Sequence, residues 1–122
     1  MWSSRTGQPP IYALKADFFR VLGHPVRVRL LQILREGEQS VGPLRDELEL
    51  DSSSASQHLA ALRAQRLVVA RKDGTSVYYR IKDARILDLL ELAKEIISGA
   101  LEDNRALLHD LAVEDFGRQV RD

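Results

Sequence analysis

Apolar residues in the first third of the chain recur with the spacing of an α-helix. One such stripe predicts a helix over residues 11–22 and consists of Ile11, Leu14, Phe18, Val21 and Leu22. Gly23 ends that helix. Pro25 starts the next one, because a proline in the first turn removes no backbone N–H that the helix needs. The second helix stops at Gly37 and supplies core residues at Leu30, Leu31, Ile33 and Leu34.

Two further helices are predicted over residues 42–48 and about 52–65. In the first of these, Leu44 and Leu48 lie one turn apart and point inward. Asp51 is a suitable N-cap for the second, because its carboxylate can accept a hydrogen bond from an amide in the first turn. A buried face of that helix is indicated by the i, i+4, i+7 spacing of Ala55, Leu59 and Leu62.

Strand-forming residues replace the helical pattern over residues 68–81. Two runs, VVARK and SVYYRI, are rich in β-branched and aromatic residues. Between them lies Asp73-Gly74, a pair typical of hairpin turns that need positive φ. We therefore predict a β-hairpin. Of Tyr78 and Tyr79 we expect one in the core and the other exposed, because successive strand residues point to opposite faces.

From Asp83 onward the pattern is helical again, with a heptad spacing. Steps of four and three residues link a seam formed by Ile86, Leu90, Ala93, Ile97, Ala100, Asn104, Leu107 and Leu111. A strict seam of this kind is narrower than a globular core stripe and favours a helix–helix dimer, with Asn104 as its polar member. We expect Leu14 and Phe18 of the first helix to join that interface. The alternative is a helix that packs within its own chain.

The order of these elements defines the predicted architecture. Two short helices followed by a hairpin form a winged helix-turn-helix, a fold that places one helix in the major groove of DNA. The fold class is mainly α with a small β-hairpin wing and N- and C-terminal dimerisation helices. We assign residues 1–10 to a flexible tail, 11–82 to the winged helix-turn-helix and 83–116 to the dimerisation helix.

Composition narrows the classes of function. The chain has no cysteine, which excludes disulfides and thiolate metal sites. No apolar run approaches the roughly 20 residues of a membrane span, and MWSSRTGQPP at the N-terminus has no hydrophobic signal core. We therefore expect a cytoplasmic protein with no membrane partner. No glycine-rich phosphate loop and no set of clustered histidines and carboxylates is present, so we expect no enzyme.

Charge is balanced over the whole chain but unevenly distributed. The formal net charge is zero. Residues 52–82 nevertheless carry six basic side chains against Asp73 alone, and residues 83–122 carry five basic and ten acidic ones. Phosphate binding requires a local positive face rather than a positive whole. The basic block coincides with the predicted helix-turn-helix and hairpin, which favours DNA as a partner.

The helix over 52–65 carries side chains suited to DNA. Small hydroxyls at Ser52, Ser53 and Ser54 allow the helix N-terminus to approach DNA closely, although serines at a helix start are commonly only caps. Gln57 can pair with adenine, whereas Ser56 can read several bases. We expect phosphate, backbone or minor-groove contacts from Arg63 and, on the hairpin, from Arg71, Lys72, Thr75 and Ser76.

Residues 15–82 resemble the arsenic-repressor (ArsR/SmtB) family of bacterial winged-helix regulators. The most specific motifs are His24-Pro25 followed by Arg27, the string SQHL over 56–59, and Gly74 followed by VYY over 77–79. The resemblance implies a homodimer that represses transcription at inverted-repeat operators in double-stranded DNA, released in many members by an inducer. It also implies that bases are read by Ser52, Ser53, Ser56 and Gln57, and that the wing contacts the DNA backbone.

The chain departs from the family's metal-sensing sites. A thiolate site on the third helix would need cysteines around residues 40–44, and there are none. The other common site pairs an early Asp-x-His with a later histidine, and Asp83-Ala84-Arg85 lacks that histidine. Only His109 remains on the last helix, near Asp103, Asp110 and Glu114. We therefore expect no metal and no cofactor.

The sequence thus predicts a homodimeric, sequence-specific, metal-independent repressor, with two alternatives. One is a winged-helix module that binds a protein. The other is a repressor released by a small organic inducer of unknown identity at the dimer interface, between the first and last helices. That pocket would be lined by Tyr12, Phe18, Phe19 and seam leucines, which at helical spacing are more often plain dimer core.

Overall fold

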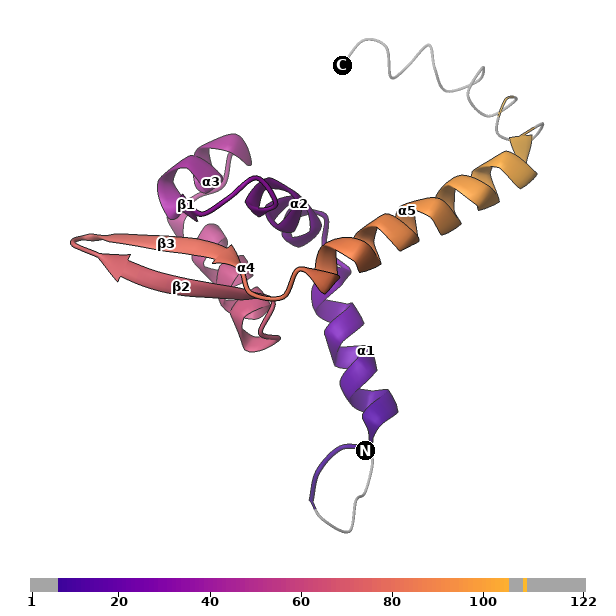
Figure 1. Cartoon of the computed structure of the whole chain (residues 1–122), viewed down its shortest axis with the longest axis horizontal. Coiled ribbons are helices and arrows are strands. Elements are labelled where there is room, and N and C mark those ends of the chain that lie inside the picture. Colours follow the sequence, from indigo (N-terminus) through magenta and orange to yellow (C-terminus); the bar gives the residue numbers. More distant parts are fainter. Residues whose placement is uncertain (1–6, 106–108, 110–122) are drawn as a thin grey trace. The chain divides into compact units, whose positions relative to one another are not determined.

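The computed structural model describes residues 7–105 and 109 of the chain (Figure 1). The chain divides into two units, Met1–Leu87 and Asp88–Asp122. Part of the predicted tail, residues 1–6, lies outside the described residues. So do residues 106–108 and 110–116 of the predicted dimerisation helix, including the seam positions Leu107 and Leu111.

The first helix begins and ends where the pattern predicts, and the second begins at the predicted Pro25 but ends at Leu34, before the predicted stop at Gly37. Helix α1 spans Ile11–Leu22 and α2 spans Pro25–Leu34. His24 is the N-cap of α2, and its ring Nδ1 accepts a hydrogen bond from the backbone N–H of Val26 at 3.2 Å. The histidine and the following proline together start α2 in a defined direction.

The helix-turn-helix consists of α3, Val41–Glu47, and α4, Ser52–Ala64. The predicted cap of α4 is confirmed, because Asp51 Oδ1 accepts a hydrogen bond from the amide of Ser54 at 2.7 Å. The predicted buried face is also confirmed, since Ala55, Leu59 and Leu62 are at most 1% exposed. These side chains form the centre of the core together with Leu30, Leu31, Leu44 and Val68.

Both of these helices end in a residue with left-handed backbone geometry. Glu49 after α3 has φ 52°, and Arg66 after α4 has φ 59°. In each case the next amide reaches back five residues, from Leu50 to the Arg45 carbonyl at 2.9 Å and from Leu67 to the Leu62 carbonyl at 3.0 Å. This is the Schellman ending, in which glycine is the usual left-handed residue.

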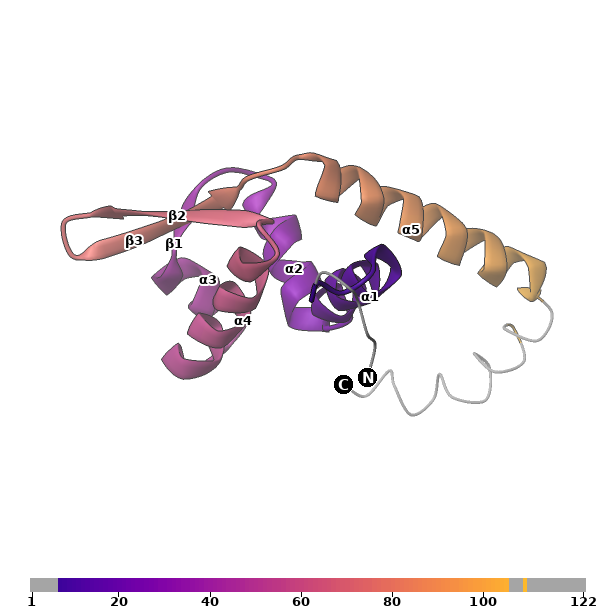
Figure 2. The ribbon, with the colours of Figure 1, turned by 90° about the horizontal axis from the view of Figure 1, so that it is seen from below.

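The predicted hairpin is formed by β2, Val68–Asp73, and β3, Ser76–Ile81, with Gly74 at φ 65° in the turn. A two-residue strand that the sequence did not predict, β1 at Gln39–Ser40, pairs antiparallel with β3 and gives a sheet of order β1-β3-β2. Two residues are too short to show a strand pattern. Figure 2 shows α3 and α4 on one side of this sheet, with the hairpin extending past them.

The expectation for the tyrosine pair is wrong. Tyr78 and Tyr79 are both half-buried. The strand alternation holds, but β1 lies alongside both residues and the Arg71 guanidinium covers the Tyr78 ring at 4.7 Å from its centroid. The ring expected to be exposed is therefore partly shielded from water.

Helix α5 spans Arg85–Asp103, two residues later than the predicted start. Asp83 precedes the helix and binds its first residue: Asp83 Oδ1 accepts hydrogen bonds from the backbone N–H and from the side-chain Nε of Arg85, each at 3.0 Å. These bonds to Arg85 lower the pKa of Asp83 to about 2. Ile86 is only 3% exposed and belongs to the core of the first unit, so it is not an exposed member of the seam.

Candidate nucleic-acid interface

Helix α4 presents one face to the core and another to solvent. Five residues of α4 that the sequence selected for DNA contact are exposed: Ser52, Ser53, Ser56, Gln57 and Arg63. At roughly 100° per residue they span an arc of about 140° outside the buried face of Ala55, Leu59 and Leu62, and this arc is called the stripe here. Gln57 and Ser53 lie farthest from the buried face, whereas Ser52 and Arg63 lie at its edge. Ser54, also at the helix start, is half-buried. The fold thus brings these side chains onto one continuous surface, which is the arrangement a groove-binding helix needs.

Hydrogen bonds within the protein already occupy two groups at the N-terminus of α4, which the sequence did not predict for Ser52. The Ser54 amide is bound by Asp51, whose pKa is lowered chiefly by that backbone hydrogen bond. Ser52 Oγ accepts a hydrogen bond from Arg45 Nη1 of α3 at 2.8 Å. The cap carboxylate stays ionised and competes with phosphate for the positive end of the helix. Neither bond involves the exposed side chains of Ser53, Ser56 and Gln57.

A cluster on the side of α4 away from the stripe ties this helix to α2. Arg27 Nε donates a hydrogen bond to His58 Nδ1 at 3.1 Å, and the rings of His24 and His58 lie 4.4 Å apart between centroids. Burial lowers the pKa of His58, and the nearby His24 and Arg27 lower it further. A neutral His58 keeps its lone pair on Nδ1 for Arg27, so the cluster holds the exposed stripe in a fixed orientation on α2.

The wing carries both free and paired side chains. Lys72 and Thr75 are exposed and Ser76 is half-buried. Arg71 instead donates two hydrogen bonds to the Glu38 carboxylate, from Nε at 2.9 Å and from Nη2 at 2.6 Å. This pair lowers the pKa of Glu38 and raises the pKa of Arg71. Arg71 is therefore a partly neutralised cation rather than the free one that the sequence suggested.

Five other cations of the basic block remain available. Within residues 7–105, those of the block with no carboxylate within ion-pair distance are Arg63, Arg66, Lys72, Arg80 and Lys82. Arg66, Arg80 and Lys82 contribute to the charge of the block but were not predicted as DNA contacts. Their only sequence signal was that charge, because the turn that positions Arg66 carries no glycine to reveal it.

Exposed apolar side chains gather on two helices. Among the described residues, all of the exposed large hydrophobic side chains lie on α1 or α5. On α1 they are Ile11, Tyr12, Leu14 and Phe19, and on α5 they are Leu92, Ile96, Ile97 and Leu101. Leu14 and Ile97, both expected at the dimer interface, are 47% and 59% exposed. Phe18 and Leu90 are half-buried, and Ala100 and Asn104 are exposed.

The residues near His109 that were weighed as metal ligands are only partly described. His109 is exposed, whereas Asp110 and Glu114 lie outside the described residues. Over residues 7–105 and 109, no three histidine, aspartate or glutamate side chains gather closely enough to hold a metal ion. Over the same residues, no helix has the length and hydropathy to cross a membrane.

The helix-turn-helix of α3 and α4 and the hairpin of β2 and β3 together define the class: a winged helix-turn-helix protein with an exposed helix face. Residues 24–69 match the family model described as "Bacterial regulatory protein, arsR family". The chain is 43% identical over 103 residues to the uncharacterized HTH-type transcriptional regulator Rv0081 of Mycobacterium tuberculosis, with 84% of this chain and 90% of that protein covered.

Solved structures agree with this assignment. The crystal structure of Rv0081 matches with a TM-score of 0.72 at 41% identity, over 79% of this chain and 97% of that one. A homodimeric winged helix-turn-helix DNA-binding domain from Mycobacterium bovis, solved by NMR, matches with a TM-score of 0.64 at 32% identity, over 80% and 94%. The chain belongs to the arsR family and is a transcriptional regulator, as the resemblance in the sequence implied.

Proposed function

We propose that the protein is a homodimeric, sequence-specific repressor that binds an inverted-repeat operator in the cytoplasm without a metal ion. The observation that carries the proposal is the exposed stripe of α4, on which Ser53, Ser56 and Gln57 face solvent together. In a winged helix-turn-helix this helix lies in the major groove. Gln57 supplies the paired donor and acceptor that match adenine, and the two serines allow close approach.

Affinity in this proposal comes from the cations around the stripe. Arg63 and Lys72 are exposed and have no carboxylate partner in the part of the chain that the structure describes. Each phosphate neutralised by such a cation releases condensed counterions, so binding should weaken steeply with salt. Thr75 and Ser76 sit at the wing tip and would contact the DNA backbone.

The dimer is supported by the exposed apolar faces of α1 and of α5, each considered by itself. A monomer rarely exposes large contiguous apolar patches, and such patches mark interaction sites. The expected seam positions Leu90, Ala93, Ile97 and Ala100 share one face of α5, and Asn104 follows the end of the helix at the same spacing. We leave Ile86 out of the interface because it is buried in its own chain. Two bound copies would place their α4 helices about one DNA turn apart, roughly 34 Å, or a multiple of that distance. The homodimeric M. bovis neighbour supports this arrangement.

The test is fluorescence anisotropy with DNA from upstream of the protein's own gene and with random DNA, each with and without Zn²⁺. We expect specific binding that is indifferent to zinc. Gln57→Ala should weaken binding to the upstream DNA and leave binding to random DNA almost unchanged. Gln32→Ala is the matched control, because Gln32 is exposed on α2 and off the stripe. Equal losses on both DNAs would contradict the base-reading role of Gln57, and zinc-induced release would contradict metal independence.

A second candidate function is a protein-interaction module, which the exposed apolar face of α5 also suits. Leu92 and Ile96 on that face are 51% and 66% exposed. Sedimentation equilibrium separates the two functions. A homodimer supports the repressor, whereas a monomer without preference for any DNA supports a heteromeric partner. An organic inducer at the dimer interface would instead appear as ligand-dependent release of the upstream DNA.

A further inference from the structure

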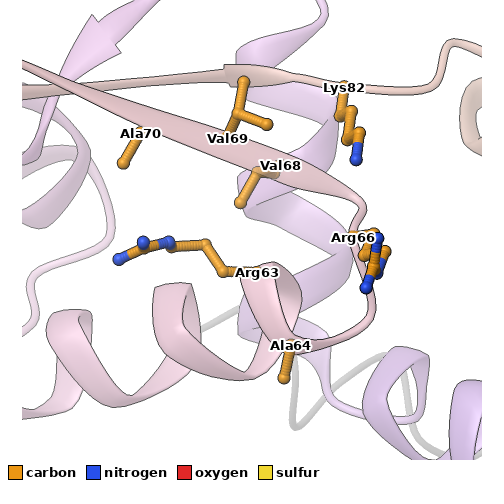
Figure 3. Close-up of a pocket in the computed structure, with 7 residues that line it drawn as sticks. All are labelled: Arg63, Ala64, Arg66, Val68, Val69, Ala70 and Lys82. Carbon is orange, nitrogen blue, oxygen red and sulfur yellow. The ribbon is translucent and has the colours of Figure 1, made fainter.

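A basic pocket lies beside the end of α4 and the start of β2. Its volume is about 440 Å³. Three cations, Arg63, Arg66 and Lys82, line it over a floor formed by residues 68–70, and no acidic residue is among its lining residues (Figure 3). Figure 3 shows Lys82 and Arg66 at the same end of the strand, while Arg63 extends from α4 in the other direction, toward Ala70.

The pocket is built by the ending of α4. Arg66 adopts φ 59°, so the chain reverses and the Leu67 amide bonds back to the Leu62 carbonyl at 3.0 Å. The Leu67 carbonyl then accepts a hydrogen bond from the Lys82 amide at 2.9 Å, which continues the β2–β3 ladder by one step. These two bonds bring Arg66 and Lys82 to the start of β2, beside the last turn of α4 that carries Arg63.

Arg66 occupies a backbone conformation that disfavours its own side chain. Left-handed geometry suits glycine, and a non-glycine residue there stores strain that can mark a functional position. Lining a pocket with cations and no carboxylate is also unfavourable, because like charges repel. An anionic ligand in the pocket would offset that repulsion.

We propose that this pocket is a phosphate-binding site. Two guanidinium groups present planar donor sets that match phosphate oxygens, and the Lys82 ammonium adds a third positive charge. The apolar floor of Val68, Val69 and Ala70 offers no competing acceptor side chain. A phosphate group entering the pocket would relieve the mutual repulsion of the three cations and replace part of its lost hydration with charge-assisted hydrogen bonds.

The phosphate comes from the backbone of the DNA that α4 reads, and on this point the inference rests on the proposed function. Arg63 lies on the same stripe as Ser52, eleven residues along a helix that rises about 1.5 Å per residue, so roughly 16 Å separate the two positions. Phosphate strands line both walls of the major groove in which such a helix lies, so cations at the end of α4 away from its base-reading start would meet a phosphate. A free phosphorylated molecule is the other source of the same chemistry.

The first arm of the test measures DNA affinity against salt concentration by fluorescence anisotropy. The double variant Arg66→Gln/Lys82→Gln removes two pocket charges and keeps polar side chains. Arg35→Gln/Lys15→Gln is the matched control, with the same charge change at exposed cations outside the pocket. Each lost phosphate contact reduces the slope of log affinity against log salt concentration by about 0.9. We therefore expect the pocket variant to reduce that slope by about two, on upstream and random DNA alike. The control should leave the slope unchanged.

The second arm follows the backbone amides of Val69 and Ala70 by NMR during titration with inorganic phosphate, against chloride at equal ionic strength. If the double variant reduces the salt dependence of DNA affinity, and inorganic phosphate causes no saturable shift of the two amide signals, the ligand is the DNA backbone. Saturable shifts that the double variant abolishes, with an unchanged DNA slope, support a free phosphorylated molecule and overturn the DNA assignment. Absence of both effects, or equal effects from the control variant, overturns the site itself.

The two proposals fail in different ways. If the wild-type protein shows no preference for any DNA, the proposed repressor function fails, and the NMR titration still decides whether the pocket binds phosphate. If the wild-type protein binds DNA specifically, but the double variant changes neither the salt slope nor the phosphate shifts, the repressor function stands and the pocket inference is wrong. Far-ultraviolet circular dichroism of each variant checks that the fold is retained.

Discussion

Two substitutions of Arg66 distinguish the effect of backbone strain at the end of α4 on stability from the effect of the Arg66 charge on DNA binding. The comparison uses Arg66→Gly and Arg66→Ala, which lose the same charge and differ only in backbone preference. At φ 59° an L-residue is disfavoured by roughly 1–2 kcal/mol, whereas glycine is not. Glycine also gains roughly 0.4–1 kcal/mol of conformational entropy in the unfolded chain, which opposes the benefit.

The net expectation is that Arg66→Gly is more stable than Arg66→Ala by about 0.5–1 kcal/mol. For a unit of this size, Met1–Leu87, a change of 1 kcal/mol shifts Tm by roughly 4–8 °C, so we expect a difference of a few degrees. Thermal and urea unfolding followed by circular dichroism measure it. All samples need the same protomer concentration, because dimerisation makes Tm concentration-dependent.

Glu49 provides the matched control for this comparison. It ends α3 with φ 52° and the same backward hydrogen bond, and it is outside the basic pocket. Glu49→Gly should likewise exceed Glu49→Ala in stability. Only the two Arg66 variants should lose DNA affinity. Relative to the wild-type protein, Arg66→Gly should therefore be more stable and bind DNA more weakly. Equal or lower stability of Arg66→Gly relative to Arg66→Ala would refute the claim that this turn is strained.

Two further predictions concern the charged clusters. The pKa of His58 in the folded protein is below its ordinary value of 6.5. As the pH falls below 6.5, His58 therefore binds a proton more readily in the unfolded chain than in the native state. The free energy of unfolding should therefore be greatest above pH 6.5 and fall as the pH drops, with a weaker fall in His58→Gln; identical pH profiles from urea titrations would exclude His58 as the source. Glu38→Gln should free Arg71 for phosphate, raise affinity for upstream and random DNA alike, and steepen the salt slope by up to about one. A slope that does not change would show that Arg71 stays away from DNA even when it is released.

Features that depend on neighbouring residues were predictable from the sequence. The bounds of α1 and the start of α2 follow from apolar spacing with glycine and proline at the ends, and the Asp51 cap of α4 involves an amide only three residues away. The hairpin turn at Gly74 is equally local. Periodicity also placed Gln57 and Ser56 outside the buried face of α4, so the exposure of these two side chains was predictable.

Pairings between distant residues were not predictable in this way. Strand β1 exists only because Gln39 and Ser40 meet Tyr79 and Tyr78, nearly forty residues later in the chain. Ile86 fitted the heptad spacing as well as Ile97 did, yet it is buried in its own unit whereas Ile97 is exposed. Spacing identifies a face of a helix, but only the packed fold decides which part of that face is covered.

The sequence by itself determined the winged helix-turn-helix, the family and the face of α4 that is exposed to solvent, because each depends on local periodicity and on short motifs. Only the tertiary structure decided which charges are free. Arg71 is paired with Glu38 across the sheet, whereas Arg66 and Lys82 meet beside α4. The physical reason is that charge interactions depend on distance in space, and for these residues that distance is set by the turn after α4 and by strand pairing.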